Sequence, residues 1–118
     1  MQKAIRIFSA LSDETRIRMI KLLESGGEVC GCDIMKAMDI SQTRASRNLN
    51  ILKDAGLVTD RRDKLWIYYT LNRKTAEECC GDVLTVIKKW LHTDDVITMD
   101  RTRLKAVLKA NKKEKKGA

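Results

Sequence analysis

The sequence predicts a mainly α-helical (α+β) domain, in which four helices precede a β-hairpin and two helices follow it. Apolar residues recur at helical spacing through most of the chain. Two segments, 57–59 and 65–71, are instead rich in β-branched and aromatic residues, and a charged stretch at 60–64 separates them as a hairpin tip would. With 118 residues, the chain has room for one modest hydrophobic core.

The first two helices are predicted from their apolar faces and end signals. The first spans residues 2–11, and Ser12 is the predicted N-cap of the second. The Ser-Gly-Gly sequence at 25–27 ends this second helix. Core-facing side chains are predicted at helical spacing in both helices: Ala4, Phe8, Leu11, Ile17, Ile20 and Leu23.

The next two helices are joined by a very short turn. A brief helix is predicted at about 32–38, with Ile34, Met35 and Met38 facing inward, and Asp39-Ile40 form the turn. Ser41 caps a longer helix that runs to about Ala55, where Gly56 suits a left-handed closing residue. Two helices connected in this way predict a helix-turn-helix.

Helical spacing resumes after the hairpin. One helix is predicted from about Arg73, with a stripe formed by Ala76, Cys80, Val83, Ile87 and Trp90. The last helix is predicted from Asp94 to about Ala110, where it gives way to a Lys-rich tail. From residue 101 onward there are eight Lys or Arg against one acidic residue, so most of the net charge of +8 lies in this tail. A basic end of this kind is typical of phosphate binding and equally of a solubilising tail.

The composition narrows the class of protein. No apolar run approaches the roughly 20 residues that span a membrane, and the amino terminus does not resemble a secretory signal. We therefore expect a cytoplasmic protein with no membrane partner. No Cys-x-x-Cys, Ser-His-Asp set or phosphate loop is present, and His92 is the single histidine. The sequence predicts neither an enzyme nor a catalytic cofactor.

The fourth predicted helix has the composition of a DNA-reading helix. Ala45, Leu49 and Leu52 form its inward stripe, and no acidic residue occurs between Ser41 and Lys53. The outward side chains are hydroxyl, amide and guanidinium groups, which read base edges and bind phosphates in double-stranded DNA, whereas ordinary solvated faces are rich in Glu and Lys. The predicted DNA contacts are Ser41, Gln42, Thr43, Arg44, Ser46, Arg47 and Asn50, with weaker candidates at the hairpin tip: Arg61, Arg62 and Lys64.

Four segments together resemble the ArsR/SmtB metalloregulatory repressors, most closely the arsenic-responsive ArsR branch. They are residues 10–16, Ile40 to Gln42 with Ser46-Arg47, residues 52–58, and the strand 66–71. The resemblance covers residues 2–92. It implies a homodimeric winged helix-turn-helix, with the first and penultimate helices at the interface, that represses a resistance operon until an inducer binds. One departure is Asn48, where the family usually has His.

The resemblance also divides the chain. Residues 1–92 would form the winged helix-turn-helix DNA-binding and dimerisation domain, and residues 93–118 the C-terminal helix and tail. Ser41, Gln42, Arg44, Ser46 and Arg47 fall on the family's DNA-reading helix, and double-stranded operator DNA is the implied partner.

Cys30 and Cys32 lie where the arsenic sensors of the family carry a Cys-x-Cys pair. In a regular helix, side chains two residues apart point about 200° apart, so the two sulfurs converge only if this turn is unwound or extended. Gly31 eases such a change. We therefore expect a thiophilic ion to deform the helix, and we expect the helix amino terminus to favour thiolates. Arsenite or antimonite, As(III) or Sb(III), is the predicted inducer.

The third ligand of the ion is left open by the sequence. Met35 occupies the position of a third family cysteine, but a thioether is a poor substitute and is predicted to be core. Cys79, Cys80, a small-molecule thiol and hydroxide remain candidates, although Cys80 lies on an apolar stripe that favours burial. Alternative functions on the same fold are a thiol-redox or persulfide sensor, a sensor of another thiophilic metal such as zinc, and a constitutive architectural DNA-binder.

Overall fold

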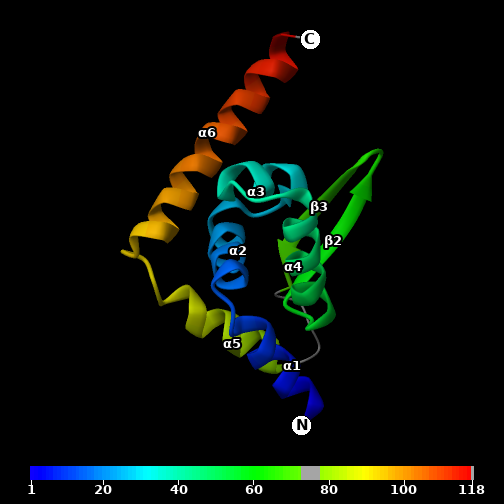
Figure 1. Cartoon of the computed structure of the whole chain (residues 1–118), viewed down its shortest axis with the longest axis vertical. Helices are drawn as coiled ribbons and strands as arrows, with labels where there is room; N and C mark the ends of the chain where they lie inside the picture. The colour runs from blue at the N-terminus through cyan, green and yellow to red at the C-terminus, as the bar shows by residue number, and fades with distance from the viewer. Residues whose placement is uncertain (73–77, 118) are drawn as a thin grey trace.

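The computed structural model describes the backbone of residues 1–72 and 78–117, and the side chains of these residues except 78–81 and 113–117. The predicted winged helix-turn-helix is confirmed, in the order helix, helix, helix, helix, hairpin, helix, helix, with one additional short strand (Figure 1). The elements are α1 (Gln2–Leu11), α2 (Glu14–Gly26), β1 (Val29–Cys30), α3 (Gly31–Met38), α4 (Gln42–Asp54), β2 (Val58–Asp63), β3 (Trp66–Leu71), α5 (Glu78–Lys88) and α6 (Asp95–Gly117).

The additional strand, β1, joins the hairpin in a three-stranded antiparallel sheet with the order β1-β3-β2. Val29 pairs with Tyr69 and Cys30 with Tyr68. Two residues are too few to show the alternation that predicts a strand from sequence. As a result, Cys30 lies in the sheet beside the hairpin, which we call the wing, and only Cys32 lies in α3.

The helix ends explain one wrong prediction and confirm two others. The N-cap of α2 is Asp13, whose carboxylate accepts a hydrogen bond from the Arg16 amide at 3.1 Å. The Ser12 hydroxyl instead donates to the Ser9 carbonyl at 2.7 Å and closes α1. Ser41 caps α4 as predicted, and Gly56 adopts φ 82° just after this helix.

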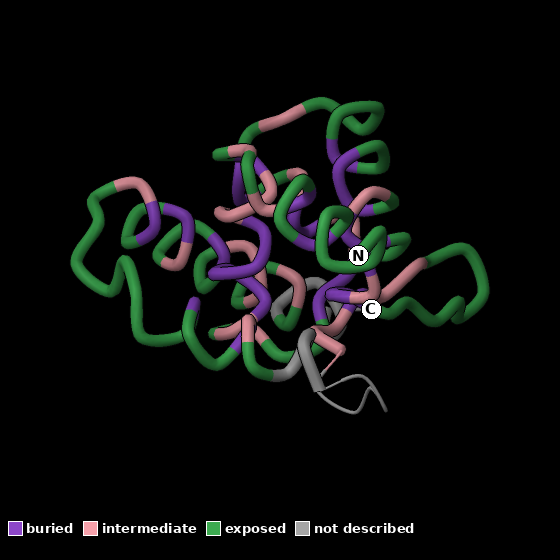
Figure 2. Tube along the Cα trace, turned by 90° about the horizontal axis from the view of Figure 1, so that it is seen from below, coloured by how far each residue is buried: buried purple, intermediate pink, exposed green. Residues whose placement is uncertain are grey.

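The core lies between the inner faces of α1 to α4, the sheet and parts of α5 and α6. Buried and exposed stretches alternate along the helices, as Figure 2 shows. The prediction for α1 is confirmed for Leu11, which packs against the core, and wrong for Phe8, which is 67% exposed. Ile7 and Ala10 form the buried face of the helix. The apolar side of α1 is wider than this small core can cover, so part of it faces outward.

Helix α6 is longer than predicted and runs past both α2 and α3 (Figure 1). Asp94 accepts a hydrogen bond from the Val96 amide at 2.9 Å, which confirms the predicted acidic cap. Arg18 of α2 holds both carboxylate oxygens of Asp100 at 2.9 Å, and Leu104 is buried beside them. The helix then continues through the Lys-rich segment to Gly117.

Lys21 of α2 is fully buried and ties α2 to the end of α5. Its ammonium group pairs with Glu24 at 2.8 Å and donates to the Ile87 carbonyl at 3.1 Å. A buried charge is tolerated when it is paired and hydrogen-bonded in this way. Among the described residues, no helix is both long enough and apolar enough to cross a membrane.

Candidate nucleic-acid interface and thiol site

Helix α4 separates its apolar and polar residues as the sequence predicts. Ala45, Leu49 and Leu52 are buried against the core. Every predicted DNA-contacting residue of the segment is exposed: Ser41, Gln42, Thr43, Arg44, Ser46, Arg47 and Asn50. The helix therefore presents a continuous polar face with two guanidinium groups and no carboxylate before Asp54.

The two arginines of α4 line a groove of about 380 Å³ between the beginnings of α2 and α4. Arg44 donates to the Thr15 hydroxyl at 2.7 Å, so one side of its guanidinium is held by α2. Within the described residues, Arg47 makes no ion pair, and its side chain is exposed. The groove gathers guanidinium and hydroxyl donors, which suit a phosphate group, although the Asp13 carboxylate that caps α2 also lines it.

Asn48 and Arg16 form a buried tie between α2 and α4 that the sequence analysis missed. Asn48 is 8% exposed; its amide oxygen accepts from Arg16 at 3.0 Å, and its amide nitrogen donates to the Arg44 carbonyl at 2.9 Å. Arg16 also donates to the Ala10 carbonyl at 2.6 Å. Asn48 thus orients α4 from within, and the spacing of an amide three residues after Ala45, beside the apolar stripe, was the available signal.

The three basic residues of the wing differ in their surroundings. Arg61 donates to Glu28 at 2.7 Å through Nε, pairs with it a second time, and stacks over the Tyr68 ring at 4.7 Å. The hydrogen bond from Arg61 lowers the pKa of Glu28 and raises that of Arg61. Arg62 and Lys64 are exposed near the hairpin tip. Arg61 is therefore engaged within the chain, whereas the other two extend from it.

The thiols of Cys30 and Cys32 lie in direct contact, with their sulfur atoms 2.8 Å apart. Cys30 precedes α3 with φ −63° and ψ 141°, an extended conformation. The two sulfurs therefore converge without any unwinding of α3, since the chain enters the helix between them. The predicted need for an extended residue is confirmed, since the strand β1 supplies it, and the sulfurs meet without the expected deformation of the helix.

The thiolate form expected at the start of this helix is contradicted for Cys32. Burial raises the pKa of Cys32 to about 12, assisted by the hydrogen bond with Cys30 and by the carboxylate of Asp33. In the free protein Cys32 is therefore in the thiol form at neutral pH.

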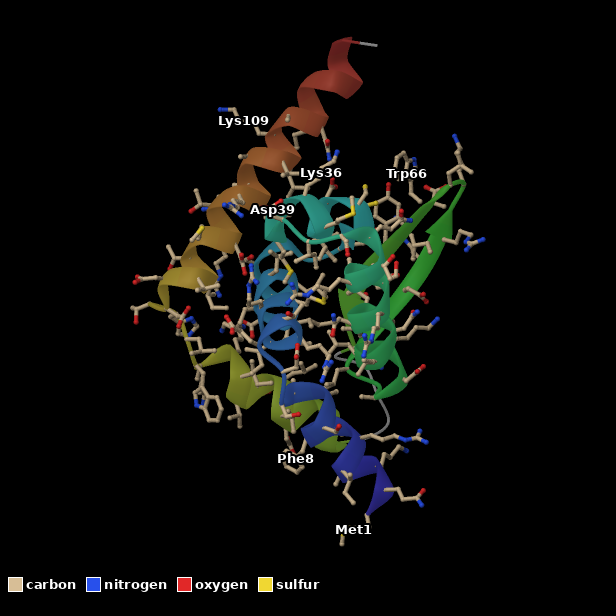
Figure 3. All side chains as sticks on the ribbon, in the orientation of Figure 1. Met1, Phe8, Lys36, Asp39, Trp66 and Lys109 are labelled. Carbon is tan, nitrogen blue, oxygen red and sulfur yellow. The ribbon has the colours of Figure 1, made fainter. Side chains whose placement is uncertain are left out.

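A pocket of about 270 Å³ opens beside the thiol pair, between α3, α4 and the wing. Figure 3 shows Trp66 on the wing, on the side toward the beginning of α3. Met35, which was predicted to be core, is half-buried and lines this pocket. A Cβ added to Gly31 would lie 3.1 Å from the Tyr69 ring, so the glycine allows a close approach of the wing.

The other candidate ligands do not join the pair within the described part of the chain. The side chains of Cys79 and Cys80 lie outside the described residues, and the helix that carries them, α5, lies at the opposite end of α2 from α3 (Figure 1). His92 is exposed. Among the described side chains, no group of three or more His, Cys, Asp or Glu residues is placed to hold a metal ion.

Asp33 connects the thiol pair to α6. It is buried next to Cys32, whose sulfur lies 3.8 Å from its carboxylate oxygen, and Asn111 donates to the same oxygen at 2.8 Å. The first turn of α3 is therefore contacted by α6 on one side and by the wing on the other. No pattern along the chain indicates this contact, which joins residues 78 positions apart.

Comparisons with known proteins decide the family. An arsenic resistance transcriptional regulator of Pseudomonas putida is 35% identical over 91 residues, which are 75% of this chain and 71% of the relative. Residues 13–60 match the family described as bacterial regulatory protein, arsR family. The chain belongs to the ArsR family. The matched segment runs from the cap of α2 into β2 and so contains the helix-turn-helix, and membership in a family of regulatory proteins confirms that the chain is not an enzyme.

Two further known proteins are similar to this chain. The arsenical resistance operon repressor of Escherichia coli is 43% identical over 68 residues, or 58% of each chain, so this chain matches about three fifths of that relative's length. A solved homodimeric winged helix-turn-helix DNA-binding domain from Mycobacterium bovis, a possible ArsR-family regulator, aligns with a TM-score of 0.62. That alignment has 30% identity and covers 74% of this chain and 76% of the other.

Proposed function

We propose that this ArsR-family protein is a homodimeric repressor that binds double-stranded operator DNA and releases it when As(III) or Sb(III) binds Cys30 and Cys32. This role would place it in the cytoplasm with the genome. The observation that carries the proposal is the meeting of the two sulfurs, 2.8 Å apart, at the beginning of the helix that precedes the DNA-reading helix.

DNA binding is supported by the outward face of α4. Its exposed donors are the groups that contact base edges and phosphates, and the groove beside Arg47 suits a phosphate. Arg62 and Lys64 on the wing extend the basic surface, while Arg61 serves mainly to hold Glu28. In a helix-turn-helix, the second helix enters the major groove, so α4 is the reading element.

Dimerisation is supported by exposed apolar side chains on α1 and α5. Ile5 and Phe8 on α1 are 58% and 67% exposed, and Val86 and Trp90, on and just after α5, are 47% and 60% exposed. Both helices lie at the end of the molecule that carries the amino terminus (Figure 1). Exposed apolar groups of this size in a small domain are typical of a protein–protein interface.

The raised pKa of Cys32 suits arsenous acid, which is neutral at neutral pH and reacts with a thiol. Each S–H supplies the proton with which a hydroxide of As(OH)₃ leaves as water, so two As–S bonds form as two As–O bonds break. An atom bonded to both sulfurs also separates them beyond their present contact. Because Cys30 belongs to β1 and Cys32 to α3, this separation moves the wing relative to the helix-turn-helix, which gives the differential binding that a switch requires.

The proposal is tested by a gel-shift titration on the protein's own promoter, with and without arsenite or antimonite. We expect the wild type to release DNA and Cys30→Ser to retain it. Cys79→Ser and Cys80→Ser are the matched controls, because they remove a thiol elsewhere; loss of release in either would identify the third ligand. If Cys30→Ser releases DNA as readily as the wild type, the sensing site lies elsewhere.

The DNA-binding part of the proposal has its own test. Arg47→Ala should weaken operator binding by about 1–3 kcal/mol, and Arg103→Ala, which removes an equal charge from an exposed position on α6, should not. Binding should also fall steeply as salt increases, because phosphate contacts displace counterions. Equal losses in the two variants, or a flat salt response, would contradict the assignment of α4.

A second candidate, a thiol-redox sensor, is favoured by the same sulfur contact, since two thiols 2.8 Å apart need little movement to form a disulfide. Mass spectrometry after treatment with an oxidant distinguishes the two. A mass loss of two hydrogens together with operator release, in the absence of any arsenical, would favour the redox sensor. Release by arsenite under reducing conditions favours the metalloid sensor.

A further inference from the structure

The pocket beside the thiol pair offers apolar surface that inorganic arsenite, which carries only hydroxyl groups, cannot contact favourably. Its walls are mostly apolar and come from α3, α4 and the wing: Met35, Ala45, Leu49, Leu65, Trp66, Ile67 and Tyr69. The volume is about 270 Å³. An apolar cavity of about 150 Å³ is enough to hold a benzene molecule. The pocket is therefore large enough for a ring-sized apolar group next to the two sulfurs.

Trivalent arsenic makes three bonds, and the Cys30–Cys32 pair accounts for two of them. No third thiol is among the residues that line this pocket in the described part of the chain. Arsenite bound by the pair alone would keep a hydroxyl as its third group. Gln42 and Ser46 are the polar side chains of the lining, and toward the other, apolar walls a hydroxyl loses hydrogen bonds to water. An arsenic atom that carries carbon as its third group would instead bury apolar surface, which is favourable.

The geometry points to a trivalent organoarsenical, with one aryl or alkyl group on arsenic, as the ligand class that this site prefers. This inference rests on the proposed function, since it uses the same thiol pair. For R–As(OH)₂, two As–S bonds form and two As–O bonds break. The two thiol protons leave with the two hydroxides as water, arsenic remains trivalent, and no electron is transferred.

The position of the pocket also gives the organic group a route to the DNA-binding surface. Gln42 and Ser46 of α4 line the pocket opposite Trp66 of the wing. Gln42 and Ser46 are both predicted DNA contacts. A group held between them and Trp66 therefore touches the reading helix and the wing at once, so the bound ligand acts directly on the spacing between the two elements.

Binding is measured without DNA. The reduced full-length protein is loaded with phenylarsonous acid or with arsenite, and dithiothreitol is added until half of the arsenic is lost, as read by native mass spectrometry. Dithiothreitol offers two thiols and no pocket, so the ratio between protein and competitor isolates the effect of the walls. We expect this ratio to favour the phenyl compound by about tenfold or more. Equal ratios for the two compounds would overturn the inference.

Variants of the wing locate the preference. Trp66→Ala should remove most of the preference for the phenyl compound and leave arsenite binding unchanged. Leu65→Ala gives a second reading at a residue that is 92% exposed and not needed for folding. Thr59→Ala on β2 is the matched control, because it changes the wing outside the pocket. A preference that survives both Trp66→Ala and Leu65→Ala would show that the pocket is not its source and would refute the inference.

The two proposals fail in different ways. If neither compound binds the wild type, or Cys30→Ser binds both as well as the wild type does, the proposed thiol site itself is wrong. If both compounds bind through the thiols and release the operator with equal competitor ratios, the proposed function holds and the organoarsenical preference does not.

Discussion

The two helices of the helix-turn-helix begin in different ways. Helix α4 begins at Ser41, whose hydroxyl accepts a hydrogen bond from the Arg44 amide at 3.1 Å. Helix α3 begins after Cys30, which makes no side-chain cap and whose sulfur contacts Cys32 instead. The reading helix is therefore closed by its own sequence, whereas the helix before it leaves its first amides without that support.

Distant parts of the chain hold the beginning of α3 in place. The Tyr69 ring lies close to Gly31, and Asn111 of α6 donates to Asp33 at 2.8 Å. Contacts of this kind can change without unfolding either helix. The difference teaches that the first turn of α4 is closed by its own sequence, while the first turn of α3 is held by neighbouring elements. A ligand at the cysteine pair can therefore alter how α3 is held.

The largest losses of stability should be equal for the two helices, because each is anchored in the core by a fully buried side chain. Leu52 of α4 and Ile34 of α3 are each 0% exposed. We expect Leu52→Ala and Ile34→Ala to lower the free energy of unfolding by about 2–5 kcal/mol each, as measured by urea denaturation. A much smaller loss for Ile34→Ala would mean that α3 as a whole, and not only its first turn, is loosely held.

The next-largest effects concern the hydrogen bonds that connect each of the two helices to the rest of the chain. Asn48→Ala removes the tie between α4 and Arg16 and should cost about 1–3 kcal/mol of stability, with weaker operator binding. Asn111→Ala removes the tie between α6 and Asp33 and should cost about 0.5–1.5 kcal/mol, with operator binding unchanged and arsenite affinity altered. The opposite pattern, measured by DNA and arsenite titrations, would reverse the roles given to these two residues.

A smaller effect should distinguish the caps. Ser41→Ala should lower the free energy of unfolding by about 0.5–2 kcal/mol, because the Arg44 amide loses its acceptor. Cys30→Ser should cost no more than about 0.5 kcal/mol, since the new hydroxyl can provide the cap that the sulfur does not. Thermal unfolding of both variants tests the contrast, which fails if Cys30→Ser is the more damaging of the two.

The smallest effect concerns protonation. Because the pKa of Cys32 is raised to about 12, the folded protein holds this proton between about pH 9 and pH 12, where an unfolded chain has lost it. The stability that Cys32 contributes is thus present below pH 9 and lost as the pH rises. Alkylation of Cys32 by iodoacetamide should be slow at pH 8 and still accelerate at pH 10–11, by peptide mapping. A rate that levels off near pH 8–9 would contradict the assignment.

The sequence predicted the DNA-reading helix α4 well because the signals for this helix are local. A cap, an apolar stripe and a closing glycine lie within Ser41 to Gly56, and each acts through neighbours along the chain. The position of the wing strands also followed from local composition, although β2 extends further toward the tip, to Asp63, than predicted. Phe8 was misplaced because helical spacing alone does not tell which of two apolar sides of α1 meets the core.

The sequence located the Cys30–Cys32 pair but did not predict how the two side chains are arranged. The Cys-x-Cys pattern located the thiols, yet their contact depends on β1, which exists only because β3 is there to pair with it. The raised pKa of Cys32, the pocket at Trp66 and the bond between Asp33 and Asn111 all join residues from separate elements. Such features arise on packing and leave no periodic mark in the sequence.

The pairing of Cys30 with Tyr68 ties one sulfur to the same ladder as the wing. Under the repression model, occupancy of the two sites is then linked by a single coupling free energy, which must be the same in both directions. The factor by which a bound arsenical lowers the affinity for operator DNA is also the factor by which bound operator DNA lowers the affinity for the arsenical. Protein held on operator DNA would therefore need a higher arsenical concentration for half-saturation than free protein does, by that same factor.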